Sequence, residues 1–586
     1  MTRGVVALAL AGAVAMSSAL LPVGAGSQSV GSTTWVSTGL PSMFEGGTAR
    51  EPAVSADGTT TAFTAAVATQ TGRSTTGRSD VFVRDTSKVE GTQVEQVSLA
   101  SDGTAAPTGS SSQPSISCDG RFVAFTSDAS LDPDDRDGGA PDIYVRDRVT
   151  GTTELVSAGL PQDASGRVVP GSVTSPSISA DGRYVTMVAT PLEQTRIVPS
   201  QVYVYDRVEQ VAKLVSRPSG GAGPGDGDSF APAISADGEV VAFASTANLD
   251  ATLDQGGPPP ARVFVWRRSD DIVTPVSVST TGGRPDGSCG PPAISQKGRL
   301  VAYACLADNL VAGDANRAGD VFVTDWAARS TVLASVGNGG QQGNGDSCQG
   351  TAPGRCDGRV SISGDGRFVA FASLATNLLE GPRPEGAGIG TAQVQPGAAS
   401  DTNDAADVFV RDLDNRRTSR VSVDTSGNEI ADGSSTDPSI SYGGRRTAFV
   451  STSGALTAGG CNRQACGPNV FVRDDGVVCF PCQTPECPPP VVVPTVRVNQ
   501  DVVPQGRVVT AVGEGVPSAA PIDVALDSER VTVTSDASGA FEAALPVAHG
   551  SPLGPHVVRA MSGTRSAKTV TLVVRPSAEP PFPSVS

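Results

Sequence analysis

Histidine is nearly absent from this chain of 586 residues, which has only His549 and His556. The residues before them cannot supply a Ser–His–Asp triad, a histidine acid–base pair or a zinc site that uses histidine. Lysine occurs only four times, and the formal net charge is −17. Neutralising phosphates needs a basic surface, so this balance argues against binding to nucleic acid or to anionic membranes.

Aromatic residues and long apolar runs are also scarce. Aromatic residues make up 4% of the chain, and most recur at equivalent positions of a repeat, which predicts that they pack in a core. The tryptophans, Trp35, Trp266 and Trp326, show no spacing typical of a sugar-binding surface, and we expect them to pack too. After residue 25, no apolar stretch reaches the length of about 18 residues that spans a bilayer.

The one long apolar run lies near the N-terminus, where Arg3 precedes VVALALAGAVAMSSALLPV and the small residues Gly24 and Ala25 follow. This order is typical of a secretory signal peptide over residues 1–25, and an uncleaved membrane anchor is the alternative. We therefore expect a secreted or cell-surface protein with no membrane span after cleavage.

Ten cysteines in an exported chain are read first as disulfides. Cys289 and Cys305 flank a predicted hairpin symmetrically, so we expect them to pair across it. Two further pairs would close small loops: Cys348 with Cys356, and Cys461 with Cys466. The sequence leaves open the pairing of Cys118, Cys479, Cys482 and Cys487.

A repeated element organises most of the chain. Seven copies start at residues 52, 114, 176, 232, 292, 360 and 438, and they read PAVSADG, PSISCDG, PSISADG, PAISADG, PAISQKG, VSISGDG and PSISYGG. An apolar run such as RFVAFTS follows each copy, then a loop, and then a third run such as DVFVRD. A fourth run, such as TTELVS at 152–157, often follows. Each unit predicts four short strands.

Four-stranded units repeated around an axis form a β-propeller. The segment TTWVSTGL (33–40) copies the fourth run TTELVSAGL (152–160), yet it precedes the first complete unit. The seventh unit lacks an obvious fourth run. We therefore predict an all-β protein with a seven-bladed β-propeller over residues 33–475, in which the N-terminal strand completes the last blade.

The core P-x-x-S-x-D-G-R-x-V-A-F-x-S of most units resembles the TolB-like, WD-like propeller repeat. This resemblance covers about residues 33–475. It implies the propeller fold but little about function, because propellers host many unrelated activities.

A different pattern follows the repeats. Residues 476–492 are rich in proline and cysteine and predict a disulfide-stapled linker, with a redox or zinc role of the Cys-x-x-Cys motif as the alternative. Seven short alternating runs then predict a small β-sandwich over 493–576. Its turn SDASGAF (535–541) and its run LGPHVVRA (553–560) resemble bacterial Ig-like modules. Residues 577–586 are expected to be a disordered tail.

The loops of the predicted propeller fall into two groups. Connections between first and second strands, and between third and fourth strands, are short and regular, and they share one face, the turn face. The remaining connections are long, differ in every unit and share the opposite face, the loop face. Repeated residues serve the repeat, so we expect a binding site on the loop face.

Acidic residues give the loop face its strongest chemical pattern. Asp314, Asn316 and Asp320 form D-x-N-x-x-x-D; Asp401, Asn403 and Asp407 repeat that spacing; Asp135, Asp137 and Asp142 approximate it with one extra residue. Alternating oxygens on a tight loop suit calcium, although these loops lack the later Gly and bidentate Glu of an EF-hand. The alternative is Asx-turns that cap loop amides.

Three functions fit these features. The leading hypothesis is a secreted, monomeric, non-catalytic protein whose loop face binds an extracellular protein, peptide or glycan. The second is a secreted polysaccharide hydrolase or lyase with paired carboxylates on the same face. The third is a calcium-stiffened structural module of the cell surface. The sequence contains no G-x-S-x-G elbow in a hydrolase domain, so it gives no support to peptidase chemistry.

Overall fold

The computed structural model describes most of residues 31–574. It leaves out 1–30, 45–46, 68–77, 90–92, 136–138, 161–169, 192–198, 220, 222, 251–259, 349–355, 380–400, 458–466, 476–486, 488–494, 499–501, 515, 517, 527–528, 549–550, 553, 563–564 and 575–586. Predictions outside the described residues are the signal peptide, the Cys461–Cys466 pair, Asp137, Cys479, Cys482 and the C-terminal tail.

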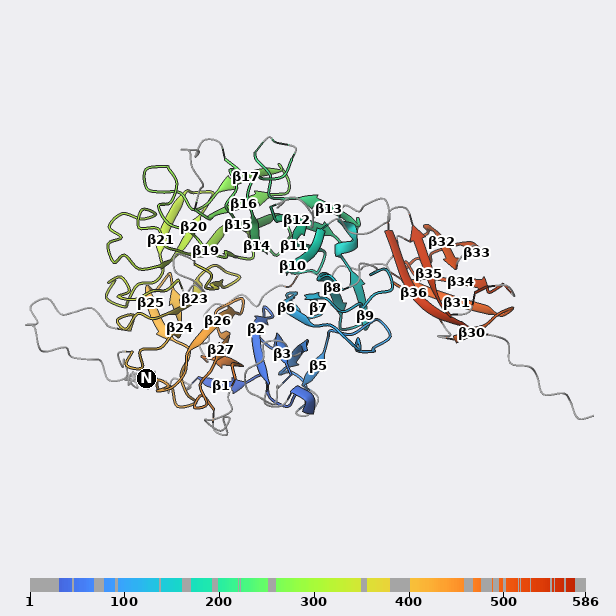
Figure 1. Ribbon diagram of the computed structural model, residues 1–586, viewed down its shortest axis with the longest axis horizontal. Helices are drawn as coiled ribbons and strands as arrows, with labels where there is room; N and C mark the ends of the chain where they lie inside the picture. Colours follow the sequence, from blue (N-terminus) through green and yellow to red (C-terminus); the bar gives the residue numbers. More distant parts are fainter. Residues whose placement is uncertain are drawn as a thin grey trace, which may run out of the picture.

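Four-stranded antiparallel sheets dominate the structure, and seven of them, sheets 1 to 7, follow one another around a ring (Figure 1). Sheet 1 contains β2 (Thr48–Val54), β3 (Thr60–Ala66), β4 (Ser79–Asp85) and β5 (Val94–Gln96). Sheet 2 contains β6 (Ser111–Ile116), β7 (Phe122–Ser127), β8 (Asp142–Asp147) and β9 (Thr152–Leu155). Sheet 3 contains β10 (Pro170–Ile178), β11 (Tyr184–Pro191), β12 (Gln201–Asp206) and β13 (Val211–Leu214).

The next four sheets continue the order of the chain. Sheet 4 contains β14 (Ser229–Ile234), β15 (Val240–Ser245), β16 (Arg262–Arg267) and β17 (Ile272–Pro275). Sheet 5 contains β18 (Ala293–Ile294), β19 (Leu300–Cys305), β20 (Asp320–Asp325) and β21 (Ser330–Leu333). Sheet 6 contains β22 (Ser361–Ile362), β23 (Phe368–Ser373), β24 (Asp407–Asp412) and β25 (Arg417–Arg420). Sheet 7 contains β26 (Ser435–Ile440), β27 (Arg446–Ser451), β28 (Asn469–Asp474) and β1 (Ser32–Trp35).

Each sheet corresponds to one sequence unit, so the all-β class and the four-stranded unit are confirmed. In sheet 2, every residue of β7 and β8 is buried, because neighbouring sheets cover both faces of these strands. Phe125 of β7 lies opposite Tyr144 of β8, and their rings stack with centroids 6.0 Å apart. Equivalent pairs are Phe63–Phe82, Phe243–Phe264, Tyr303–Phe322, Phe371–Phe409 and Phe449–Phe471. The repeated aromatic residues therefore form core, as predicted.

Clusters of buried apolar side chains join each sheet to the next. Phe125 of sheet 2 packs with Ala62 of sheet 1, and further clusters join sheets 2 and 3, 3 and 4, 4 and 5, 5 and 6, and 6 and 7. The last cluster joins Val470 of sheet 7 to Phe63 of sheet 1. The row of sheets thus returns to its start and closes.

The N-terminal strand completes sheet 7, as predicted from its likeness to a fourth strand. β1 pairs antiparallel with β28, with Ser32 opposite Asp474 and Trp35 opposite Phe471. The residues after β1 add Val36 and Phe44 to the cluster between sheets 7 and 1. The two ends of the repeat region therefore hold one sheet together.

Residues 495–574 form two further sheets, drawn in red in Figure 1 outside the ring. One contains β29 (Thr495–Val498), β31 (Val508–Glu514) and β34 (Phe541–Pro546). The other contains β30 (Val502–Pro504), β36 (Arg565–Val574), β35 (Gly554–Ser562), β32 (Pro521–Leu526) and β33 (Glu529–Thr534). Both contribute to one apolar cluster that includes Val509 and Ile522. Arg559 of β35 pairs with Asp134 of the ring at 3.1 Å (Nη2 to Oδ1).

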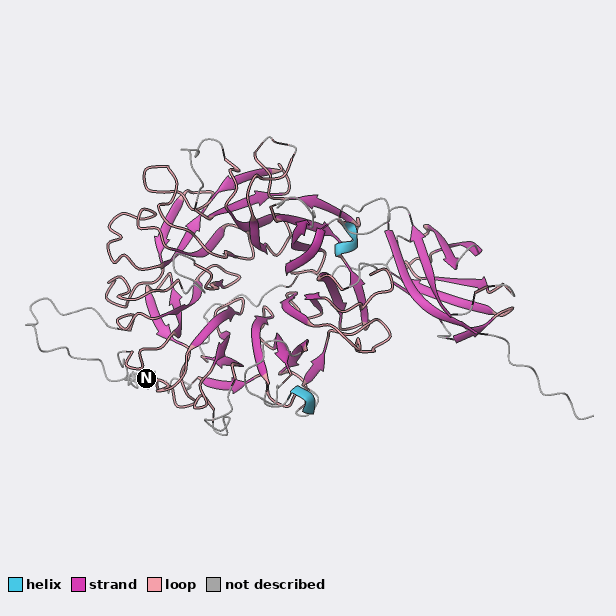
Figure 2. Ribbon diagram, in the orientation of Figure 1, coloured by secondary structure: helices cyan, strands magenta, loops and turns pink. Residues whose placement is uncertain are grey.

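Helix is limited, in the part of the chain that the structure describes, to two 3-10 turns, η1 (Ser42–Phe44) and η2 (Ser157–Gly159) (Figure 2). None of the described residues forms a helix long and apolar enough to cross a membrane. Trp266 is fully buried, and Trp35 and Trp326 pack against apolar clusters, so the tryptophans pack as predicted.

Two predicted disulfides are confirmed, Cys289–Cys305 and Cys348–Cys356. A third, between Cys118 and Cys487, joins residues that are 369 positions apart and was not predicted.

Candidate binding face

The turns between first and second strands form a second ring, inside the ring of sheets. In each turn, the carbonyl of the residue after the serine accepts a hydrogen bond from a backbone N–H of the turn before it. The first five bonds, at 2.9–3.0 Å, run from Ala56 to Cys118, Cys118 to Ala180, Ala180 to Ala236, Ala236 to Gln296, and Gln296 to Gly364. The Asp365 N–H donates to Tyr442 (3.3 Å), and the Tyr442 N–H donates back to Ala56 (2.9 Å). All seven turns therefore surround one axis on the turn face.

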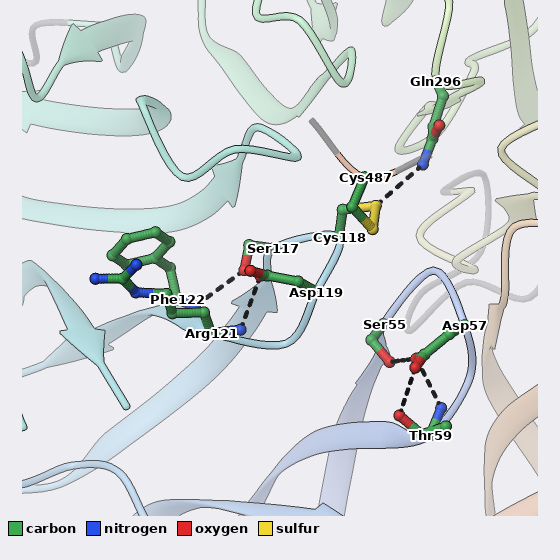
Figure 3. The surroundings of a disulfide bond; sticks show 10 residues. All are labelled: Ser55, Asp57, Thr59, Ser117, Cys118, Asp119, Arg121, Phe122, Gln296 and Cys487. Carbon is green, nitrogen blue, oxygen red and sulfur yellow. Dashed lines mark hydrogen bonds between the residues drawn. A yellow bond between two sulfur atoms is a disulfide. The ribbon is translucent and has the colours of Figure 1, made fainter. Parts of the chain in front are cut away.

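The Cys118–Cys487 disulfide lies inside this ring of turns (Figure 3). Gln296 belongs to sheet 5, which is not a neighbour of sheet 2, yet its Nε2 lies 3.9 Å from the Cys118 Sγ. The two side chains thus meet across the ring. Cys487 lies after sheet 7 in the chain, and its bond to Cys118 places it at the axial end of the turn face.

The repeated polar residues of the turns are satisfied within the turns themselves. In sheet 2, the Ser117 Oγ donates to the Asp119 Oδ1 (2.8 Å) and accepts from the Phe122 N–H (2.9 Å), while the Arg121 N–H donates to the same Asp119 oxygen (3.0 Å). Figure 3 shows a related arrangement at Ser55 and Asp57. These carboxylates serve the turn, as their repetition predicted.

The loop face carries the predicted metal residues, and the last Asp of each set has a role in the fold. Asp142 and Asp407 each begin a third strand, and each accepts a 2.5 Å hydrogen bond from a serine that follows the fourth strand, Ser157 or Ser422. Asp320 accepts the same bond from Ser335. Sheets 1, 3 and 7 repeat it with Asp80 and Ser98, Gln201 and Ser216, and Asn469 and Ser37. One oxygen of the last Asp in each predicted set is therefore committed to its sheet.

The first predicted set shows no shared ligand geometry. The Asp135 Oδ2 accepts a hydrogen bond from the Tyr144 hydroxyl at 2.6 Å, and burial together with this bond raises the pKa of Tyr144. Asp142 is held by Ser157, and Asp137 lies outside the described residues. Asp135 and Asp142 thus each stabilise the loop or strand in which they lie.

The second set lies in the loop before β20. The Asn316 Nδ2 donates to the Asp320 Oδ2 at 2.7 Å, and the Asn316 Oδ1 accepts from the Ala318 N–H at 3.1 Å. Asn316 therefore forms an Asx-turn, as the alternative interpretation predicted. Both carboxylate oxygens of Asp314 are buried without a hydrogen-bond partner. Burial, followed by the charges of Asp320 and Asp308, raises the pKa of Asp314 to about 6.

The third set lies before β24 and repeats this frame. The Asn403 Oδ1 accepts from the Ala405 N–H at 2.8 Å, and the Asn403 Nδ2 donates to the Ile430 carbonyl at 2.8 Å. Asn403 also forms an Asx-turn, so its amide oxygen is already used. In each of these two loops, the asparagine that the sequence suggested as a ligand instead shapes the turn.

Two residues that the sequence analysis missed complete the third set. Carboxylate oxygens of Asp401, Asp407 and Glu429 all lie within 4.8 Å of one another, and the described residues contain no other such group of three acidic, histidine or cysteine side chains. Arg420 of β25 lies among them, with its Nη1 2.8 Å from the Glu429 Oε1. Glu429 holds the loop because the Thr402 N–H donates to its Oε1 at 2.8 Å.

Electrostatics differ between the three carboxylates. Burial raises the pKa of Asp401 to about 6, although the charge of Arg420 opposes this shift. Burial also raises the pKa of Asp407, against the hydrogen bond from Ser422. The pKa of Glu429 is lowered: burial would raise it, but the bond from the Thr402 amide and the charge of Arg420 outweigh burial. Two of the three carboxylates therefore hold a proton more tightly than usual, and the third holds it less tightly.

A clear sequence signal for Glu429 exists in hindsight. Gln342 in sheet 5 has the same role as Glu429 in sheet 6. The Gln342 side chain accepts a hydrogen bond from the Ala315 N–H, and the Glu429 side chain accepts one from the Thr402 N–H. In both pairs the two residues are 27 positions apart. An alignment of sequence units 5 and 6 would therefore have matched Glu429 with Gln342, the residue that holds the D-x-N-x-x-x-D loop of sheet 5.

Comparison with known proteins identifies no family. No family model matches the chain, and no curated protein matches it. Among solved structures, the β-propeller domain of the Trilobed protease from Pyrococcus furiosus is 9% identical, with 73% of this chain and 95% of that chain covered and a TM-score of 0.40.

Two further structures are similar. A protein described as a TolB from Agrobacterium tumefaciens is 16% identical, with 49% and 80% of the two chains covered and a TM-score of 0.31. The Dos1 propeller is 11% identical, with 73% and 93% covered and a TM-score of 0.34. With TM-scores this low, the case for a propeller rests on the strand pairing, the seven clusters and the ring of turns in this chain.

Proposed function

We propose that this protein is a secreted, non-catalytic binding protein whose loop face recognises an extracellular protein, peptide or glycan. The scaffold is a seven-bladed β-propeller over residues 33–475. A linker over 476–492 joins it to an Ig-like β-sandwich over 493–576, which acts as a spacer or second contact. The signal peptide directs the chain out of the cell.

The closure of the ring supports this architecture. Sheet 7 packs on sheet 1, and the hydrogen bonds between the turns return from Tyr442 to Ala56. A propeller with protected edges is a rigid support for variable loops.

The observation that carries the choice of face is the difference between the two faces in how their polar residues are used. On the turn face, the Cys118–Cys487 disulfide lies at the axial end, and the polar turn residues are bonded to one another. On the loop face, residues such as Thr280, Arg317 and Asp404 are exposed, and their loops differ between sheets. Distinct exposed side chains on a fixed frame favour recognition there.

The burial of the acidic group favours binding over sugar hydrolysis. Only 1–11% of the side-chain surfaces of Asp401, Asp407 and Glu429 is exposed. General acid catalysis needs a carboxyl group within hydrogen-bond reach of the substrate. A sugar ring at the surface does not have that access to Asp401 or Asp407. The described histidine, His556, lies 2.8 Å (Nε2) from the Pro552 carbonyl in the C-terminal sheets.

The experiment screens the purified, disulfide-intact protein against a glycan array and a peptide display library. Any captured ligand is then titrated against two loop-face variants, Thr280→Arg and Arg317→Asp, and two turn-face controls, Val149→Arg and Asp414→Arg. All four side chains are exposed, so each variant is expected to fold. We expect at least one loop-face variant to weaken binding about tenfold, because a buried contact of a binding site is worth about 1.4 kcal/mol or more.

Two outcomes contradict the proposal. If the affinity for a captured ligand falls only in the turn-face controls, the binding site lies on the turn face and not on the loop face. Turnover of an array glycan by the wild-type protein would show that the protein is a catalyst.

A further inference from the structure

The acidic group of sheet 6 contains more negative charge than its surroundings balance. Three carboxylates, Asp401, Asp407 and Glu429, face one guanidinium, Arg420, which leaves a formal charge of −2. The side chains of Asp401, Asp407 and Arg420 are 2%, 1% and 3% exposed. Water therefore cannot offset this charge as it does at a protein surface.

Arg420 meets the three carboxylates unequally. Its Nη1 makes a close ion pair with Glu429 at 2.8 Å, but its Nε is 3.5 Å from the Asp407 Oδ2 and its Nη2 is 3.9 Å from the Asp401 Oδ1. The Asp401 Oδ2 is buried, and no N–H or hydroxyl group of the described residues donates to it. A buried charged oxygen without a partner is costly, so this position favours an additional cation.

The matching loop of sheet 5 shows what is special about sheet 6. Leu333 takes the place of Arg420, because each lies opposite the central phenylalanine of its third strand. Gln342 takes the place of Glu429, and its neutral amide both accepts from the Ala315 N–H (3.2 Å) and donates to the Gly313 carbonyl (2.9 Å). A carboxylate at Glu429 cannot donate. Sheet 6 thus has a third carboxylate, together with one guanidinium, where sheet 5 has a neutral amide and a leucine.

We propose that Asp401, Asp407 and Glu429 bind a calcium ion on the loop face. The group offers only carboxylate oxygens, which are the ligands that hard cations prefer, and it contains no histidine or thiolate to favour zinc. Loop ligands from two connections suit the flexible coordination of calcium better than the strict octahedron of magnesium. Glu429 takes the ligand role that the sequence assigned to Asn403, whose amide is committed to its Asx-turn.

The ion adds a link between two loops that the Thr402–Glu429 and Asn403–Ile430 hydrogen bonds already join. Asp401 lies in the loop that leads into β24 and Asp407 begins that strand, whereas Glu429 lies in the loop that follows β25. Glu429 is the most exposed of the three, with 11% of its side-chain surface open, so the ion enters from that side. Binding would stiffen this part of the loop face, and this site does not depend on the proposed recognition function.

Calorimetry of the full chain tests the site, with calcium chloride as the probe after treatment with chelator. We expect one binding event with a Kd of about 0.1–1 mM, as in other extracellular modules. Glu429→Gln and Asp401→Asn keep the side-chain shapes, and each should weaken binding at least about tenfold by removing a charged ligand. The matched control is Asp314→Asn in sheet 5, which should leave the affinity unchanged.

Each other result overturns the site. The absence of heat from the wild-type protein at about 5 mM calcium would mean that Arg420 and protons alone balance the carboxylates. Heat that survives in both Glu429→Gln and Asp401→Asn would place binding elsewhere. Loss of heat in Asp314→Asn would assign the ion to sheet 5.

Discussion

On the turn face, Asp119, Asp181 and Asp365 each accept the same pair of hydrogen bonds, one from a serine two residues before and one from a backbone N–H two residues after. On the loop face, Asp314 and Asp401 occupy equivalent places in neighbouring sheets, yet each keeps a buried oxygen without a partner. The repeat thus supplies partners for these repeated turn carboxylates. Where the sheets diverge, polar groups are left over, and these are the groups available for ligands.

The largest expected effect comes from breaking the closure on which both faces depend. A chain that begins at residue 47 lacks β1 and removes Val36, Leu40 and Phe44 from the core, where they are 1%, 9% and 3% exposed. Burial of each such side chain contributes about 1.5–3 kcal/mol, so we expect a loss of about 5 kcal/mol or more. Unfolding in urea, followed by fluorescence, measures it.

A peptide of residues 31–46 provides the control for this truncation. Added in trans, it should restore stability, because it can pair with the free edge of β28. Equal stability of the full-length and shortened chains would show that β1 does not close the ring.

A smaller effect on stability distinguishes the two faces, when alanine replaces one of two glycines that have similar φ angles. Gly182 of the turn face has φ +78° and touches the Phe122 ring of the previous sheet, so an added Cβ would collide with that ring. Gly103 of the loop face has φ +82° and nothing within 4 Å of an added Cβ. Gly103→Ala should cost about 1 kcal/mol for the backbone alone, and Gly182→Ala about 3 kcal/mol.

Thermal unfolding of the two glycine variants checks this difference. The same contact recurs at other turns, for example Gly238 against Tyr184 and Gly444 against Phe368. Equal losses in the two variants would mean that the turn glycines are selected for their backbone angle and not for packing between sheets.

Sequence reasoning succeeded where the information is local. The S-x-D-G turn and the apolar runs beside it specify strands from their own residues, and the likeness of TTWVSTGL to TTELVSAGL was enough to place β1 on β28. These features need only neighbours in the chain, or a copy elsewhere to compare with.

It failed where the closed ring brings distant residues together. Cys118 and Cys487 meet because seven turns surround one axis, which no spacing in the sequence records. Glu429 and Arg420 reach Asp401 through the register of β24 with β25 and the loop beyond it. The D-x-N-x-x-x-D pattern marked two loops with the same local frame, but in both of them the asparagine to which it assigned a ligand role forms an Asx-turn.

The smallest expected effect concerns Asp314, the unbalanced carboxylate of sheet 5. The charged groups that face it are the carboxylates of Asp320, Asp308 and Asp286, and together with burial they raise its pKa to about 6, above an unfolded value near 4. The folded state therefore holds the proton more tightly than the unfolded state. The stability from this proton is complete below about pH 4 and is lost as pH rises through about 6.

Asp314→Asn cannot lose that proton, so we expect it to be more stable than the wild-type protein at pH 7 and equal to it at about pH 4. Asp314 as a residue is only half-buried, although its two carboxylate oxygens are covered, so we expect the gain at pH 7 to stay below about 1 kcal/mol. Melting temperatures of both proteins between pH 4 and 7 measure the difference. A variant that is less stable at pH 7 would show that the Asp314 carboxylate has a stabilising partner, and the contrast between satisfied turns and unsatisfied loops would then hold only for Asp401.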